Sequence, residues 1–154
     1  MKKEDRYDSL FQYYGDLKKV DWLLLKAQVK AESNFDPDAI SWVGAKGLAQ
    51  FMNRTYMEWH DGTAGIGKVE YPHKYKLIDP RDPEDGIFAQ ASFMSHLLKS
   101  YKGDIPKTLA AYNWGPGNVS KWIKGEKKRL PDETSKYIKR VMRYLKKYEK
   151  EVLV

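Results

Sequence analysis

The sequence contains no cysteine, and this absence excludes disulfide bonds, thiol nucleophiles and cysteine-ligated metal sites together. It also lacks any run near the roughly 20 apolar residues that a membrane-spanning helix needs, so we expect no membrane span. The basic start at residues 1–6 has no apolar stretch after it, unlike a secretory signal peptide. Delivery to a target outside the cell would therefore need another route.

Enough apolar and aromatic residues are present for a folded protein. Hydrophobic residues make up 42% of the 154 positions and aromatic residues 14%, which is typical of a globular chain rather than a disordered one. A chain of this length suits a single hydrophobic core. We therefore predict one domain over residues 1–154.

The charge is unevenly distributed along the chain. Residues 101–154 contain 14 Lys and Arg against 6 Asp and Glu, whereas residues 1–100 contain 14 against 15. A basic C-terminal third suits any polyanion, whether nucleic acid or the carboxylate- and phosphate-rich cell wall. A solvated helix face explains the same charge at least as well. Charge alone therefore leaves polyanion binding open.

Apolar periodicity predicts an all-α fold. A buried helix is indicated by a stripe at helical spacing, and Pro37 requires that helix to end near Ser33 or Asn34. A second helix is predicted over 47–59, and further helices over 105–113 and 118–124. The stripe of the first helix consists of Val20, Leu23, Leu24, Ala27 and Ala31.

Two longer helices follow in the prediction. Asp82 and Pro83 form a helix start, with inward residues Ile87, Ala91, Met94, Leu98 and Tyr101. The last helix begins near Pro131, and its inward residues are Ile138, Val141, Leu145, Tyr148 and Val152. Between the second and third helices, glycines and prolines interrupt 60–80, where we expect a short β-hairpin or lid.

Three ordered motifs carry a family resemblance. Glu32-Ser33 is followed by a glycine-rich segment ending in Gln50 and Met52, the run Leu-Ala-Ala-Tyr-Asn-Trp-Gly-Pro-Gly-Asn-Val occupies 109–119, and Leu-Pro-Asp-Glu-Thr occupies 130–134. Together they resemble the signature of soluble lytic transglycosylases and goose-type lysozymes, which cut the glycan strands of bacterial cell wall. The resemblance implies a lysozyme-like all-α fold.

Glu32 is the candidate catalytic residue. From its position, partial burial and the negative end of its helix both disfavour the charged carboxylate and raise its pKa, as a general acid requires. Glycoside cleavage normally uses two carboxylates, and no second one stands in an obvious partner motif. The resemblance implies a single-carboxylate route: Glu32 protonates the glycosidic oxygen and then deprotonates the C6 hydroxyl of muramic acid, which closes a 1,6-anhydro ring.

The resemblance also implies substrate-binding residues. Ser41 aligns with a serine near the reacting sugar, and Tyr112 with Asn113 match the motif that orients the carboxylate and the transition state. Each candidate has an ordinary structural alternative: helix capping for Ser41, core packing for Met52 and Tyr112, and a helix start for Glu133. The full set is Ser41, Gln50, Met52, Tyr112, Asn113, Glu133 and Tyr137.

Aromatic residues are candidates for sugar subsites. Sugar rings stack their C–H faces on aromatic side chains, although aromatic residues more often pack in a core. We expect about half of the four tryptophans near the motifs to be core residues. These are Trp42, Trp59, Trp114 and Trp122.

Several positions depart from the family pattern. Gly86 stands where the pattern has Asn, and Gln90 stands where it has a helix-packing glycine, so two helices are expected to lie further apart there. Asn53 replaces a proline after Met52, and the 60–80 stretch is longer than usual. None of these changes involves Glu32, so they bear on substrate fit.

The predicted function is that of a peptidoglycan lytic transglycosylase cutting between N-acetylmuramic acid and N-acetylglucosamine. The alternatives are a goose-type lysozyme, which hydrolyses the same bond with water positioned by an Asp in 60–85, and a non-catalytic domain that binds cell wall or another polyanion. We expect a monomer that binds peptidoglycan, with no metal, no cofactor and no specific nucleic acid. Action at the cell wall without a signal peptide suggests phage-encoded or virion-associated delivery.

Overall fold

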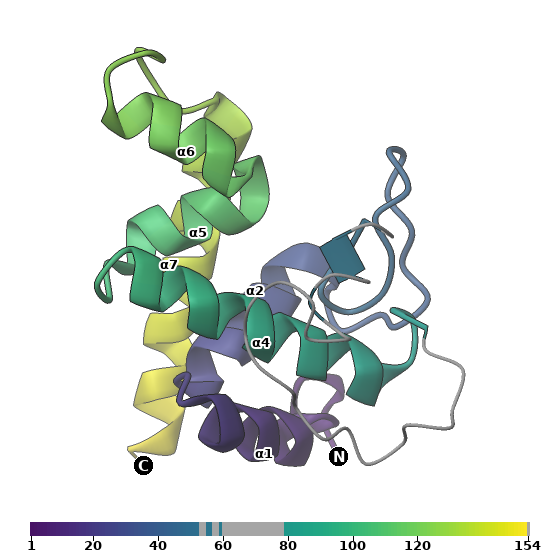
Figure 1. The fold of residues 1–154 in the computed structure, drawn as a ribbon. Helices are drawn as coiled ribbons and strands as arrows, with labels where there is room; N and C mark the ends of the chain where they lie inside the picture. The colour runs from purple at the N-terminus through teal and green to yellow at the C-terminus, as the bar shows by residue number, and fades with distance from the viewer. Residues whose placement is uncertain (53–54, 57–58, 60–78, 154) are drawn as a thin grey trace.

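The computed structural model describes residues 1–52, 55–56, 59 and 79–153, and its named elements are all helices (Figure 1). No β-strand is formed within these ranges, where pairing is limited to isolated bridges of Lys46 with Ile40 and Phe51. The all-α prediction is confirmed, while the hairpin or lid expected at 60–80 lies almost wholly outside the described residues. The elements are η1 (Lys3–Asp5), α1 (Asp8–Lys18), α2 (Trp22–Ser33), α4 (Pro83–Ser100), α5 (Ile105–Trp114), α6 (Pro116–Ile123) and α7 (Asp132–Val152).

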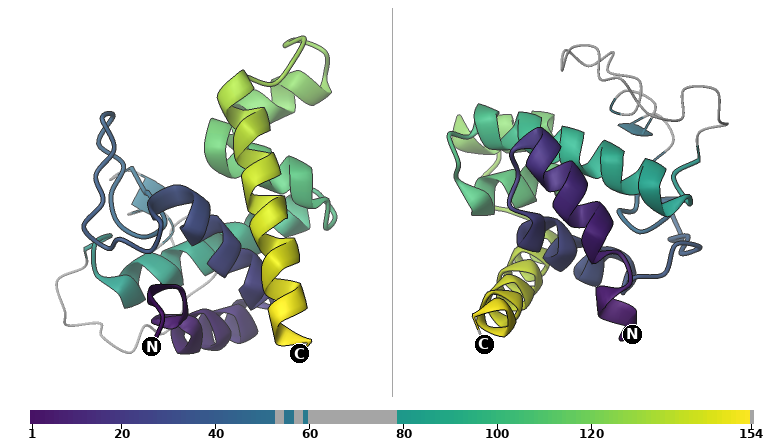
Figure 2. Two further views of the ribbon diagram at one scale, coloured as in Figure 1. Left: turned by 180° about the vertical axis from the view of Figure 1, so that it is seen from behind. Right: turned by 90° about the horizontal axis from the view of Figure 1, so that it is seen from below.

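Helix α2 lies at the centre of the molecule. Helices α1, α4 and α7 pack around it, and α5 and α6 pack against each other beyond the N-terminal half of α7 (Figures 1 and 2). One hydrophobic cluster joins α1, α2, α4 and α7, and a second is formed by residues of α4 and α5 with Ala49, Phe51, Tyr56 and Trp59.

The N-terminal helix α1 was not predicted from the sequence. Phe11 and Tyr14 are fully buried on its inner face, and the Tyr14 hydroxyl donates to Glu84 Oε1 of α4 at 2.6 Å. Tyr7, Phe11 and Tyr14 stand at i, i+4 and i+7, the spacing of a helical stripe, but charged residues surround this pattern. Tertiary burial of these three rings therefore explains why this segment is helical.

Helix α2 begins and ends where local chemistry requires. The Asp21 side chain accepts from the Leu23 N–H at 3.0 Å, and Asn34 at the other end has a left-handed backbone with φ of 50°. The predicted end near Ser33 or Asn34 is confirmed. In the middle of α2, the buried Lys26 ammonium lies 2.9 Å from both Asp5 and Asp8, so the N-terminal segment neutralises a charge on the central helix.

The helix predicted over 47–59 is wrong at its start. Residues 46–51 form a turn instead, in which Gly47 has φ of +82° and Gln50 has φ of +55°. Neither value fits a right-handed helix. Among the described residues that follow, 55, 56 and 59 are helical, so helical structure begins after the turn.

The start of α4 is confirmed. The Asp82 side chain accepts from the Asp85 N–H at 3.0 Å, and Pro83 is the first helical residue. Three of the five predicted inward residues, Ile87, Ala91 and Met94, are buried, while Leu98 and Tyr101 are partly buried. Segment 116–123 forms α6, slightly earlier than the predicted 118–124.

Helix α7 carries the predicted apolar face over most of its length. Val141, Leu145 and Tyr148 are buried and Ile138 is partly buried. The prediction that Val152 points inward is wrong, because this residue ends the helix beyond the packed region and is 59% exposed. No helix in the described ranges has the length and apolar character needed to cross a bilayer.

Gly47→Ala tests how tightly the 46–51 turn is held. A Cβ atom at residue 47 would lie 1.9 Å from the Pro80 carbonyl oxygen, so alanine would force the turn away from the start of α4. We expect a loss of roughly 2–4 kcal/mol in the free energy of unfolding, measured by urea denaturation. Gly103→Ala is the control, because Gly103 has the same φ of +82° but nothing within 4 Å. Equal losses for the two variants would contradict the role of the Pro80 contact.

Candidate active site

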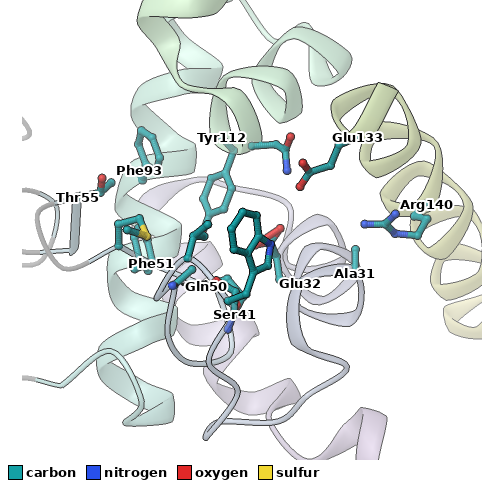
Figure 3. A pocket seen from close by; sticks show the side chains of 15 residues that line it. Ala31, Glu32, Ser41, Gln50, Phe51, Thr55, Phe93, Tyr112, Glu133 and Arg140 are labelled. Atoms are coloured by element: carbon teal, nitrogen blue, oxygen red, sulfur yellow. Dashed lines mark hydrogen bonds between the residues drawn. The ribbon is translucent and has the colours of Figure 1, made fainter. Parts of the chain in front are cut away.

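A pocket of about 400 Å³ opens at the C-terminal end of α2 (Figure 3). The 39–52 segment and α5 form one wall, and α7 forms the opposite wall, with Glu32 between them. Its lining residues are Ala31, Glu32, Ser41, Trp42, Val43, Ala45, Gln50, Phe51, Met52, Thr55, Phe93, Tyr112, Asn113, Glu133 and Arg140. The pocket therefore collects all the predicted site residues except Tyr137.

Glu32 is held in the last turn of α2. The next residue, Ser33, donates from its hydroxyl to the Leu48 carbonyl at 2.8 Å, which joins the end of the helix to the pocket wall. Asn34 and Phe35 then adopt left-handed backbones, and the Phe35 ring is buried. These contacts fix the direction in which Glu32 enters the pocket.

The environment of Glu32 favours its protonated form. Burial by the surrounding protein raises the pKa of Glu32 to about 8, even though the residue keeps some exposure to the pocket. The Arg140 cation opposes this rise in pKa, the Glu133 carboxylate adds to it, and the Tyr137 hydroxyl opposes it. Near neutral pH, Glu32 can therefore hold the proton that a general acid must donate.

Ser41 and Gln50 shape the wall that faces Glu32. The Ser41 hydroxyl accepts from the Ala45 N–H at 3.0 Å, which closes the turn at the tip of this segment. Gln50 Nε2 donates to the carbonyls of Ala39 at 3.0 Å and Gly47 at 2.8 Å. Ser41 thus has a turn-stabilising role rather than a helix-capping one, and both residues still line the pocket.

Tyr112 and Asn113 connect α5 to the 39–52 segment and to α7. The Tyr112 hydroxyl donates to the Ala49 carbonyl at 2.9 Å, and burial raises its pKa well above the ordinary value. Its ring packs against the rings of both Phe51 and Phe93, which also pack against each other. Asn113 Oδ1 accepts from the Thr134 hydroxyl of α7 at 2.8 Å. The predicted pair therefore holds the two walls at a fixed separation.

The rim of the pocket is apolar on one side and acidic on the other. Trp42 is 97% exposed and Met52 is 46% exposed, so neither is a core residue. Glu133 lies on the opposite rim in the first turn of α7, exposed and directed toward the pocket (Figure 3). These three residues can reach a bound ligand without changing the fold.

Tyr137 does not line the pocket. Its side chain is 1% exposed and its hydroxyl oxygen accepts from Gln28 Nε2 at 3.2 Å, within the hydrophobic core. The prediction of Tyr137 as a substrate-binding residue is therefore corrected: α7 turns this residue toward the core, where it packs among buried residues and contacts Gln28 of α2.

Sequence reasoning missed several side chains of the pocket, among them Arg140, Phe51 and Phe93, and one buried connection. Arg140 stands seven residues after Glu133, the spacing of two helical turns, and this spacing was the available signal. Phe51 and Phe93 follow from no motif. Gln90, expected to separate two helices, is fully buried and donates to Gln28 and to the Leu25 carbonyl of α2.

A smaller pocket of about 210 Å³ continues from the first one. It shares Thr55, Phe93 and Tyr112 with the main pocket, and Trp59 and His96 extend it. Trp59 stacks on Phe93 with ring centroids 4.8 Å apart and is 6% exposed, which makes it mainly a packing residue. Within the described ranges, no three His, Asp or Glu side chains are grouped as metal ligands.

Comparison with known proteins gives a consistent result. The family model described as "Transglycosylase SLT domain" matches residues 9–135. The chain is 28% identical over 148 residues to the soluble lytic murein transglycosylase of Escherichia coli K12, covering 90% of this chain and 22% of that protein. It is 29% identical over 141 residues to the peptidoglycan transglycosylase gp16 of Escherichia phage T7, covering 88% of this chain and 10% of that protein.

A solved structure shares the fold. The 70 kDa soluble lytic transglycosylase Slt70 of Escherichia coli superimposes with a TM-score of 0.74 at 28% identity, covering 92% of this chain and 24% of that one. The predicted fold is therefore confirmed. The chain spans about a fifth of the curated Escherichia coli relative and a tenth of the phage relative.

The raised pKa of Glu32 predicts a pH-dependent stability. Between the ordinary value of 4.5 and about 8, the folded protein holds a proton that the unfolded chain has released, so its stability falls as pH rises through this window. Glu32→Gln removes this cost. We expect the variant to be more stable than the parent at pH 8 by about 1–3 kcal/mol, because pocket water reduces the full effect, with a smaller difference at pH 5.

Urea unfolding at the two pH values measures this difference. Glu149→Gln is the matched control, because Glu149 is exposed on α7 and lies outside the pocket. The control should follow the parent at both pH values. If Glu32→Gln shows the same stability difference at pH 5 and pH 8, the buried state of Glu32 is not the cause.

Proposed function

The chain belongs to the transglycosylase SLT domain family, and from this membership we propose that it is a peptidoglycan lytic transglycosylase. The reaction is cleavage of the β-1,4 bond between N-acetylmuramic acid and N-acetylglucosamine, with formation of 1,6-anhydro-muramic acid. The observation that carries the proposal is Glu32: a carboxyl group in a 400 Å³ pocket whose pKa is raised to about 8 by burial.

The proposed mechanism uses Glu32 twice. In the first step the protonated carboxyl donates to the glycosidic oxygen, and the bond from C1 to that oxygen breaks as positive charge develops on the muramic acid ring. In the second step the Glu32 carboxylate accepts the proton of the C6 hydroxyl, whose oxygen bonds to C1. Glu32 ends protonated, and the substrate supplies the nucleophile.

The pocket supports a single-carboxylate route. Among the described residues, Glu32 and Glu133 are the carboxylates that line it, and Glu133 is exposed at the rim. A Glu133 role in binding the substrate fits this position better than one in chemistry. Tyr112 and Asn113 supply no carboxylate; their hydrogen bonds link α5 to the 39–52 segment and to α7 and so hold the pocket in shape. Ser41 and Gln50 line the same pocket from the 39–52 segment.

Hydrolysis of the same bond is the second candidate function. It requires an Asp in 60–85 that positions a water molecule. Asp79 pairs with Arg81, Asp82 caps α4 and the buried Asp85 accepts from the Asp79 N–H, so these three aspartates have structural roles. None of them lines the pocket, whereas Asp61 lies outside the described residues. This observation favours the transglycosylase route.

The proposed partner is peptidoglycan, and the proposed place of action is the bacterial cell wall. The likeness to the phage T7 protein supports delivery by a phage, and we propose that the chain acts as a monomer. A purely binding role for the domain is disfavoured, because a glycan-binding protein gains nothing from a buried carboxyl group with a raised pKa. The basic face of α7 fits attraction to an anionic wall.

Glu32→Gln tests the proposed chemistry. The variant keeps the shape of the side chain but cannot donate or accept the proton, so we expect cleavage of purified peptidoglycan to fall by roughly 100- to 10,000-fold. Mass spectrometry of the parent's products should show 1,6-anhydro ends, one water lighter than hydrolysis products. Reducing muramic acid ends would indicate the hydrolase instead, and unchanged cleavage by Glu32→Gln would remove Glu32 from the mechanism. Glu149→Gln serves as the active control.

Trp42→Ala tests the exposed rim of the pocket. An indole that is 97% exposed contributes little to folding, yet it lies where a sugar ring can stack on it. We expect KM for soluble glycan fragments to rise roughly 5- to 10-fold, while the free energy of unfolding changes by less than about 0.5 kcal/mol. Trp42→Tyr should retain most of the binding. A stability loss without a change in KM would contradict a role in substrate binding.

A further inference from the structure

We propose that Arg140 is a specificity-determining residue, whose guanidinium group binds a carboxylate carried by the C3 side chain of muramic acid. Glycan strands with a free carboxylate on that side chain would thereby be selected over uncharged ones. The inference rests on the function proposed above, which supplies the substrate. It starts from the placement of one guanidinium group in the wall of the pocket (Figure 3).

Helix α7 holds Arg140 at the edge of its buried face. Thr134, Tyr137 and Val141 are buried, whereas Arg140 is half-buried and lines the pocket. Figure 3 shows its side chain extending from α7 into the pocket, toward the wall from which Glu32 projects. The apolar stem of an arginine can pack along such an edge while the charged end of the side chain reaches the cavity.

Arg140 has no ionic partner in the part of the chain that the structure describes. Other basic side chains of α2 and α7 do have partners there, since Lys26, Lys30 and Lys147 pair with acidic residues of the N-terminal segment. Glu133, the other charged residue of the same pocket wall, stands two helical turns from Arg140, about 10 Å along the axis. Charged side chains are seldom enclosed without a partner, so this guanidinium is available to a ligand.

Glu32 does not neutralise this cation near neutral pH. The Arg140 charge lowers the pKa of Glu32, but burial has the larger effect and raises this pKa to about 8. Below that pH the Glu32 carboxyl group is mainly protonated and therefore uncharged. The pocket then presents a guanidinium cation beside a neutral acid, so Glu32 does not repel an incoming anion.

A carboxylate is the anion that matches both this cation and the proposed substrate. Guanidinium groups bind carboxylates through two parallel N–H···O hydrogen bonds, a geometry that a lysine ammonium group does not provide. The lactyl group on C3 of muramic acid ends in a carboxyl group, which is free in bare glycan or is joined to a stem peptide with carboxylates of its own. C3 lies two bonds from C1, where the proposed cleavage takes place beside Glu32. A carboxylate carried there enters the same pocket as Arg140.

Two other roles of Arg140 would give different results. A guanidinium group that only stabilises the Glu32 carboxylate acts equally on every substrate, whatever charge the substrate carries. One that only keeps α7 soluble acts like Arg143, which is exposed and lies over the Tyr144 ring, 5.4 Å from its centroid. Direct recognition, in contrast, discriminates a carboxylate from its uncharged ester.

Equilibrium binding of two small ligands tests this discrimination. The ligands are N-acetylmuramic acid, whose lactyl carboxylate is free, and muramyl dipeptide, whose free carboxylate belongs to the peptide. Each acid is compared with its methyl ester. Neither ligand contains the bond that is cut, so binding is followed without turnover, from the amide NMR shifts of ¹⁵N-labelled protein. The variants are Arg140→Gln and Arg140→Lys, with Arg143→Gln as the matched control outside the pocket.

We expect the parent protein to bind at least one of the two acids roughly 10-fold more tightly than its ester. Arg140→Gln should remove this preference, and Arg143→Gln should keep it. Arg140→Lys should keep a part, because an ammonium group retains the charge but not the bidentate geometry. Raising the salt concentration to about 0.5 M should weaken the preference of the parent, a measurement that needs no variant. The acid that shows the preference identifies the lactyl group or the stem peptide as the source of the carboxylate.

Three outcomes would overturn the inference: equal affinity for acid and ester in both pairs, no saturable binding of either acid, or a preference that survives Arg140→Gln. The outcome is separable from that of the proposed function. Anhydro products from a parent protein without any preference for the acids would defeat this inference alone. Retained cleavage by Glu32→Gln would defeat the proposed function, while the preference for a carboxylate would still be measurable.

Discussion

The removal of one carboxyl group from water is the constraint on which the rest of the site depends. Glu32 stands at the C-terminal end of α2, where both burial and the helix dipole disfavour a negative charge. Such a position lowers the stability of the charged folded protein, so other contacts have to offset it. The hydrophobic core formed by α1, α2, α4 and α7 contributes the stability that offsets this loss. The loss of stability falls on Glu32, the residue whose protonation the proposed chemistry needs.

Three of the five described non-glycine residues with positive φ lie close to Glu32 along the chain or in the pocket wall, the other two being Lys19 and Lys102. Asn34, Phe35 and Gln50 all have positive φ, although none is glycine, and all three lie in the segment that leads from α2 into the pocket wall. Such conformations cost of order 1–3 kcal/mol each and persist only where neighbouring contacts hold them. The Ser33 hydrogen bond to Leu48 and the two Gln50 amide bonds are those contacts. These three strained positions thus lie in the same part of the chain as the proposed acid, Glu32.

The helix ends that depend on neighbouring residues in the sequence were predicted correctly. Pro37 ended α2 where expected and Asp82 capped α4, because these effects act within a few residues. The 46–51 turn escaped prediction, since Gly47 lies close to the Pro80 carbonyl and these two residues are distant in sequence. Helix α1 escaped because burial of three aromatic rings outweighs its polar composition.

The candidate site likewise combines residues that the sequence motifs selected with contacts that the sequence did not reveal. Motif matching selected Glu32, Tyr112 and Asn113 and marked Gln90 as a departure from the family pattern, but the hydrogen bond from Gln90 to Gln28 could not be predicted, because the partner of a buried polar residue is set by the packing of helices. Tyr137 was selected by its motif, but its burial in the core was not predicted, since spacing along α7 cannot distinguish a residue that faces the pocket from one that faces the core.

The chain between Trp59 and Asp79 is fixed at both ends by contacts that do not involve the stretch itself. Trp59 stacks on Phe93, the Asp79 N–H donates to the Asp85 carboxylate, and Pro80 rests against Gly47. Closing a loop between fixed ends depends only weakly on its length, with each doubling costing about 0.6 kcal/mol. The packing at these two ends therefore constrains the length of the chain between them only weakly. A change in the number of residues there would leave the described pocket side chains and their contacts in place.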